Sequence, residues 1–136
     1  MPSETSESQN ATCHRLLTAI SDLDLALLHT VCTENVVLNV PGARDVDLTR
    51  ASRGAEALCQ WADAIHRLCG KTTFVLHRYF ENGCELMAMG KISIERHPRE
   101  FESPCAIHLR FEAGRVAYFQ LLLDTSALDK FRGEMD

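Results

Sequence analysis

The sequence predicts an α+β fold in which helices cover one face of a mostly antiparallel sheet. In the first half of the chain, three segments carry apolar residues every three or four positions, the spacing of an amphipathic helix. After Gly70 the spacing changes, and apolar residues alternate with polar ones in four successive segments, as in half-buried strands. Helices gathered before a run of strands indicate an α+β fold with one covered sheet face.

The chain of 136 residues has the length of one domain that can bury a core without metals or disulfides. Residues 1–9 are polar and acidic with no apolar anchor, so we expect a disordered tail there. The single domain is then expected over residues 10–136.

Two helices and a strand are expected first. The apolar stripe of the first helix consists of Cys13, Leu16, Leu17 and Ile20. Either Asp22 or Asp24 can cap a second, shorter helix, because a carboxylate accepts hydrogen bonds from free amides at a helix start. Residues 35–40 form a short β-branched run that predicts a strand, ended by Pro41 and Gly42.

A third helix is expected after the polar loop 42–54, with Gly70 as its C-terminal stop. Its apolar stripe consists of Leu58, Trp61, Ala62, Ile65 and Leu68. Turn residues then separate the predicted strands, which are residues 72–80, 84–97, 100–111 and 115–124. Asp124 ends the last apolar run, and we expect it to cap a final helical segment over residues 126–132.

The last predicted strand is apolar on both faces. Phe119, Leu121 and Leu123 alternate with Tyr118 and Leu122. The second face is too apolar for plain solvent exposure, which indicates contact with another subunit. The predicted dimer face consists of His108, Arg110, Tyr118 and Leu122, and self-association as a homodimer is the expected partnership.

Charge and cysteine spacing exclude other partners. The net charge is −5 and no basic cluster occurs, which argues against a nucleic-acid partner. No signal peptide or membrane-length apolar run appears, so no membrane association is expected. The six cysteines form no C-x-x-C pair, which favours buried reduced thiols in a cytoplasmic protein. No metal site and no cofactor are expected, since neither ligand spacing nor a glycine-rich phosphate loop occurs.

The order of these elements, the Glu81-Asn82-Gly83 turn, the segment 101–119 and the closing segment 121–128 together resemble SnoaL-like proteins of the nuclear transport factor 2-like superfamily. The likeness covers roughly residues 11–132. It implies a strongly curved sheet that forms a cone with an apolar pocket, and a homodimer formed through the outer sheet faces. Activities on this scaffold include polyketide cyclisation, ketosteroid isomerisation, scytalone dehydration and epoxide hydrolysis, and other members bind proteins or have no known activity.

Three catalytic patterns of the superfamily lack their acids in this chain. Val40 stands where ketosteroid isomerases have an Asp, and Ile20-Ser21 stands where scytalone dehydratase has Tyr-Asp. Leu121 stands about where limonene epoxide hydrolases have an Asp in the last strand. The resemblance therefore indicates a fold but no particular reaction.

Three residues are candidates for chemistry. Asn39 matches a polar pocket residue of the epoxide hydrolases and would orient a substrate. His77 or Lys91 would transfer a proton, although both also have ordinary surface interpretations. Asp45 and Asp47 lie on a loop expected to border the pocket mouth. The residues predicted to line the pocket are Val37, Asn39, Trp61, Met87, Met89, Phe119, Leu121 and Leu123.

Two functional hypotheses remain open. The first is a cofactor-independent isomerase, cyclase, dehydratase or hydrolase that acts on a small lipophilic metabolite. The second is a non-catalytic dimer of the same fold that binds a small apolar organic ligand or another protein.

Overall fold

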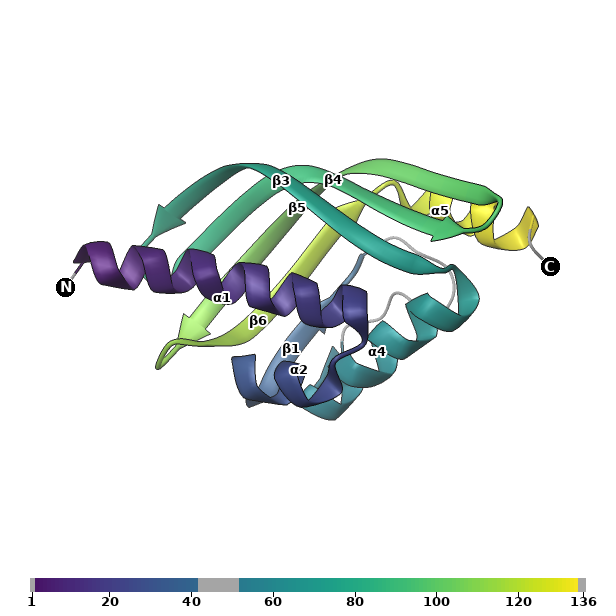
Figure 1. Cartoon of the computed structure of the whole chain (residues 1–136). Coiled ribbons are helices and arrows are strands. Elements are labelled where there is room, and N and C mark those ends of the chain that lie inside the picture. Colours follow the sequence, from purple (N-terminus) through teal and green to yellow (C-terminus); the bar gives the residue numbers. More distant parts are fainter. Residues whose placement is uncertain (1, 42–51, 135–136) are drawn as a thin grey trace.

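The computed structural model describes residues 2–41 and 52–134, and it has the predicted α+β architecture (Figure 1). The helices are α1 (Pro2–Asp22), α2 (Leu25–Val31), α4 (Ala55–Leu68) and α5 (Thr125–Glu134). The strands are β1 (Cys32–Asn39), β2 (Ser52–Arg53), β3 (Lys71–Asn82), β4 (Glu85–Arg96), β5 (Arg99–Glu112) and β6 (Arg115–Leu123).

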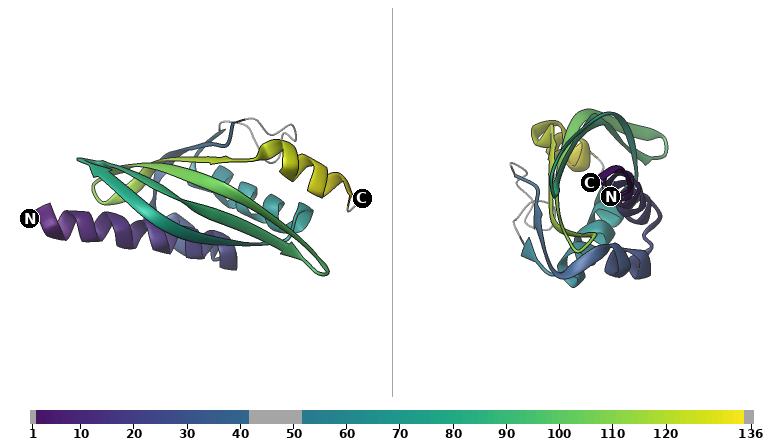
Figure 2. Two further views of the ribbon diagram at one scale, coloured as in Figure 1. Left: turned by 90° about the horizontal axis from the view of Figure 1, so that it is seen from above. Right: turned by 90° about the vertical axis from the view of Figure 1, so that its left-hand side faces the viewer.

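The strands form one sheet with the order β2-β1-β6-β5-β4-β3. The pairs from β3 to β6 are antiparallel, as the alternating pattern predicted, and β1 adds to β6 in the parallel direction. The sheet curls around α1, which lies along its concave side, while α4 covers the part near β1 (Figures 1 and 2). The prediction of helices packed on one face of a strongly curved, mostly antiparallel sheet is confirmed.

The structure departs from the expected elements at α1 and at β2. Helix α1 begins at Pro2, where a disordered tail was expected over residues 1–9. The buried Gln9 side chain donates a hydrogen bond to the Gly83 carbonyl at 2.8 Å, a long-range contact that sequence spacing cannot reveal. Strand β2 pairs with β1 at a place where only loop was expected. The expected pocket-mouth residues Asp45 and Asp47 lie outside the described residues.

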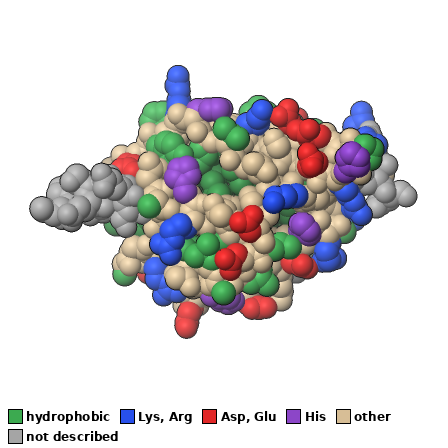
Figure 3. All heavy atoms as spheres, in the orientation of Figure 1, with side chains coloured by type: hydrophobic (Ala, Val, Ile, Leu, Met, Phe, Trp, Pro, Cys, Tyr) green, Lys and Arg blue, Asp and Glu red, His purple; other side chains and the backbone are tan. Residues whose placement is uncertain are grey.

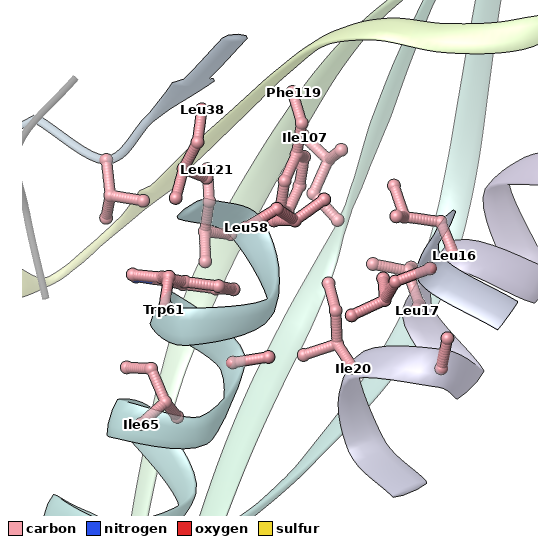
Figure 4. Close-up of a cluster of buried hydrophobic side chains, with 14 of the residues drawn as sticks. Leu16, Leu17, Ile20, Leu38, Leu58, Trp61, Ile65, Ile107, Phe119 and Leu121 are labelled. Carbon is pink, nitrogen blue, oxygen red and sulfur yellow. The ribbon is translucent and has the colours of Figure 1, made fainter. Parts of the chain in front are cut away.

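The inner face of the sheet and the helices share one apolar core. Side chains from α1, α4 and the sheet converge there, and Phe119 is completely buried (Figure 4). The rings of Trp61 in α4 and of Phe119 meet in a T-shaped contact, with 6.0 Å between their centroids. Because such interiors are close-packed, these side chains act as core residues that hold α4 on the sheet.

The curvature of the sheet has a local cause where β3 bulges. The register between β3 and β4 shifts between Leu76 and Arg78, which leaves His77 as the extra residue. Gly90 lies opposite this bulge, and a Cβ atom there would overlap the backbone carbonyl of Val75. The absence of a side chain at Gly90 therefore allows the two strands to approach closely.

No helix in the described ranges is both long and apolar enough to cross a membrane.

Candidate functional site

The residues predicted to line one pocket lie on opposite faces of the sheet. Trp61, Phe119, Leu121 and Leu123 belong to the core side. Strand register places the other four on the outer face, because Val37 pairs with Tyr118, Asn39 with Gln120, Met87 with His108 and Met89 with Ala106. A single slip of one residue exchanges the faces of a strand, which is why sequence alternation alone misassigned Val37, Asn39, Met87 and Met89.

The three candidates for chemistry also lie away from the core. Asn39 donates a hydrogen bond to the Tyr118 hydroxyl at 3.3 Å on the outer face. Lys91 Nζ lies 2.9 Å from a carboxylate oxygen of Glu102, and about half of each side chain is exposed. The hydrogen bond and the charge of Glu102 raise the pKa of Lys91, whereas an amine acting as a base needs a lowered pKa. His77 is exposed at the β3 bulge.

The four residues of the predicted dimer face all lie on the outer side of the sheet. His108 Nε2 lies 2.7 Å from a Glu85 carboxylate oxygen, and the His108 ring makes a T-shaped contact with the Tyr118 ring. The guanidinium of Arg110 lies over the same Tyr118 ring, 4.6 Å from its centroid. These contacts order Tyr118 and make a rigid aromatic and polar patch at the centre of the outer face.

Within the described part of the chain, a groove between α1 and the edge strand β3 brings polar side chains together over an apolar floor. Its volume is about 320 Å³. Figure 3, in the orientation of Figure 1, shows hydrophobic side chains in a hollow on this face with charged groups and histidines around it. The residues that line this α1–β3 groove are His14, Leu17, Thr18, Ser21, Asp22, Lys71, Thr73, Phe74 and Leu76.

Helix and strand periodicity explain this composition. The five α1 residues recur at three- and four-residue spacing, so they share one side of the helix. Leu17 is buried and belongs to both the core and the groove floor, while Thr18 is exposed at the rim. Phe74 and Leu76 are half-buried against the core. The groove thus has an apolar floor continuous with the core and a polar rim.

Hydrogen-bonded and charged groups mark two ends of the groove. At one end the Tyr79 hydroxyl lies 2.9 Å from His14 Nε2, and the two rings are tilted against each other. At the other end Lys71 Nζ lies 3.9 Å from an Asp22 carboxylate oxygen, with both side chains more than half exposed. An ion pair this long and exposed contributes little stability, so its charges remain available to a bound molecule.

Sequence reasoning missed this groove. None of the residues that line it is among the predicted site residues. The available signal was the polar stripe of His14, Thr18, Ser21 and Asp22 beside the apolar stripe of α1. What the stripe faces depends on β3, which begins at Lys71, 49 residues after Asp22. Among the described residues, no three His, Cys, Asp or Glu side chains are grouped closely enough to hold a metal ion.

The curved sheet, the long helix on its concave side and the helix-first element order define the nuclear transport factor 2-like class of α+β proteins. Residues 13–119 match the family described as SnoaL-like domain, and the chain belongs to that family. A sequence comparison with curated proteins gave no match.

Solved structures share the fold at low sequence identity. Bal32a from a soil-derived mobile gene cassette is 22% identical, with a TM-score of 0.81 over 93% of this chain and 98% of that one. TerC, co-crystallized with polyporic acid, is 11% identical, with a TM-score of 0.79 over 93% of this chain and 98% of that one. An LEH-like epoxide hydrolase of M. tuberculosis is 12% identical, with a TM-score of 0.74 over 94% of this chain and 91% of that one. At these identities the similarity establishes the fold alone.

Proposed function

We propose that this protein binds a small organic molecule with an apolar body in the α1–β3 groove. The observation that carries the proposal is the composition of the groove, in which Leu17, Phe74 and Leu76 form a floor beneath a polar rim. Small-molecule sites are typically concave and mostly apolar, with a few polar groups that fix the ligand's orientation. The volume of about 320 Å³ suits a ligand of about two fused rings.

The comparisons support a ligand of this kind. TerC was crystallized with polyporic acid, a small organic molecule, and another similar structure is called an epoxide hydrolase. An enzyme built on this groove would be a cofactor-independent isomerase, cyclase, dehydratase or hydrolase, because such reactions need only a bound substrate and a group that transfers protons. His14, Asp22 and Lys71 are the groove residues with ionisable side chains, and of these histidine is the type most often used for proton transfer.

The test is to fill the groove. An environment-sensitive apolar dye such as 1-anilinonaphthalene-8-sulfonate should bind the folded protein and be displaced by planar two-ring compounds. Thr18→Trp places a large side chain at the exposed rim and should weaken dye binding at least tenfold. Gln60→Trp, at an exposed position of α4 outside the groove, is the matched control and should leave binding unchanged. Equal dye affinity in both folded variants would place the binding site elsewhere.

The outer face favours a second role, self-association as a homodimer. Val75, Phe80, Met89 and Leu122 are 41–53% exposed, and the register puts all four on the outer face. Exposed apolar residues gathered on one face are typical of an interaction surface. In this second role the protein would be a dimeric module whose partner is another copy of itself, and ligand binding would not be required.

A cytoplasmic location fits the cysteines. All six lie in the described part of the chain, and the structure records none of them in a disulfide. Five are buried and Cys84 is exposed. Thiols persist in reducing compartments, which supports the cytoplasm as the proposed location.

A further inference from the structure

The contact between Tyr79 and His14 joins β3 to α1 beside the groove. The Tyr79 hydroxyl and His14 Nε2 are 2.9 Å apart, a normal hydrogen-bond length, and the ring centroids are 5.8 Å apart. This bond occupies one of the two nitrogens of an imidazole ring that lines the groove. The ring has a second polar atom, Nδ1, which this bond does not use.

The chemistry of the two groups sets the direction of this hydrogen bond. A phenol is a stronger acid than a neutral imidazole N–H, and an imidazole lone pair is a stronger acceptor than a phenolic oxygen, so Tyr79 donates to Nε2. Burial, and then the neighbouring Cys13 thiol, raise the pKa of Tyr79, which keeps the phenol protonated. A neutral imidazole that accepts at Nε2 must carry its proton on Nδ1.

We propose that Tyr79 holds His14 in the tautomer with the proton on Nδ1, and that this N–H binds the oxygen of a carbonyl-bearing ligand in the groove. The proposal rests on the ligand-binding function proposed above. His14 would contact the ligand, and Tyr79 would be a positioning residue that acts through His14. Free histidine in water prefers the opposite tautomer, so the arrangement depends on Tyr79.

The shape of the groove narrows the ligand further. His14 and Asp22 are eight residues apart on α1, which corresponds to about 12 Å along the helix axis. Leu17 lies between them along the helix, and Leu17, Phe74 and Leu76 are the large apolar residues that line the groove. A planar two-ring hydrocarbon body can cover this floor while a carbonyl substituent reaches His14. The shape therefore fits a ligand with a planar apolar body and a carbonyl group at the end near His14.

The tautomer is measured first, in the free protein. Long-range ¹H–¹⁵N correlation spectra at pH 8 distinguish a protonated Nδ1 from a protonated Nε2. We expect His14 to be protonated on Nδ1, and we expect Tyr79→Phe, which removes only the hydroxyl, to shift the ring toward protonated Nε2. A His14 ring protonated on Nε2 in the unaltered protein, or unchanged by Tyr79→Phe, would overturn the positioning role of Tyr79.

Binding is then measured with two probes of similar shape, 2-acetonaphthone and 2-ethylnaphthalene. The first has a carbonyl group where the second has a methylene. His14→Phe keeps an aromatic ring and removes both nitrogens. This variant should lower the affinity for 2-acetonaphthone about three- to tenfold, the range for losing one neutral hydrogen bond. The affinity for 2-ethylnaphthalene should stay within about twofold, because that probe offers His14 no acceptor.

The outcomes separate the two proposals. If His14→Phe lowered the affinity for both probes equally, the proposed hydrogen bond from His14 would be wrong. The groove would still be a ligand-binding site. Failure of both probes to bind the unaltered protein would overturn the groove function, and the carbonyl ligand class with it.

Discussion

The carboxylate of Asp124 accepts a hydrogen bond from the backbone N–H of Ala127 at 2.9 Å, at the start of α5. The Asp124 carbonyl also accepts the first helical hydrogen bond, from the N–H of Leu128. This geometry is that of an N-cap, as the sequence predicted. We expect Asp124→Ala to lower the free energy of unfolding by about 0.5–2 kcal/mol in urea denaturation, the usual scale for losing a cap.

Asp124→Asn is the matched control for that prediction. Asparagine caps almost as well as aspartate, so this variant should be nearly as stable as the unaltered protein. Ligand binding should survive in both variants, because Asp124 does not line the groove. A stable Asp124→Asn variant that lost binding would assign the carboxylate a chemical role.

The apolar outer face predicts a dimer in solution. Light scattering at micromolar concentration should give about twice the chain mass of 15.2 kDa. Leu122→Glu adds a charge to the outer face and should yield a folded monomer, because burying an unpaired charge in an interface is costly. Leu25→Glu changes an equally exposed leucine on α2 and should remain dimeric. A monomeric unaltered protein would contradict the prediction.

Because β3 and β4 approach closely at Gly90, adding one methyl group there should lower the stability of the fold. Gly90→Ala would place its Cβ against the Val75 carbonyl, which is backbone and cannot rotate away. We expect the free energy of unfolding to fall by about 1–3 kcal/mol, the scale of overpacking. Gly133→Ala in α5, where a Cβ meets no atom, should be neutral or slightly stabilising. Equal stabilities would mean that β3 shifts freely at its bulge.

Thiol reactivity should follow burial. A disulfide-exchange reagent at pH 8 should modify the exposed Cys84 quickly and the five buried cysteines slowly in the folded protein. Six thiols should titrate after denaturation without a reductant. Fewer than six would reveal oxidation in the isolated protein, and several fast thiols before denaturation would contradict the burial.

Alkaline pH should destabilise the fold through the same buried thiols. Burial raises the pKa of Cys13 and Cys32 from 9.0 to about 12 and that of Cys105 to about 11. Their stabilising contribution is fully present below pH 9.0 and declines above it, because the unfolded chain then releases thiol protons that the folded protein retains. The midpoint of urea denaturation should therefore fall as pH rises above 9, and Cys13→Ala should show a smaller fall. An equal fall in both proteins would assign the effect to other groups.

Much of the fold was predictable because its signals are local. The change of apolar spacing at Gly70 predicted the four-strand meander, and β3 to β6 form it. Asp24 caps α2 through a hydrogen bond from the N–H of Leu27, one of the two caps proposed for that helix. Such caps and turns depend on neighbours within a few residues, so the sequence carries them directly.

The parts that were missed depend on contacts between distant segments. The parallel pairing of β1 with β6 sets the face of Asn39, and the bulge at His77 changes the register of β3. Nothing near Asn39 in the sequence encodes the position of Tyr118, its hydrogen-bond partner. The pocket residues were therefore assigned partly to the wrong face, although their secondary structure was assigned correctly.

The sequence by itself determined the class of fold, the family resemblance and the amphipathic helix that carries His14. Periodicity and turn chemistry are properties of short segments, so they do not depend on residues elsewhere in the chain. Only the tertiary structure decided that this helix lies against β3, that Tyr79 reaches His14 and that an apolar floor separates them from Lys71. The physical reason is that a groove exists only between two surfaces, and their separation and register follow from the packing of the whole core.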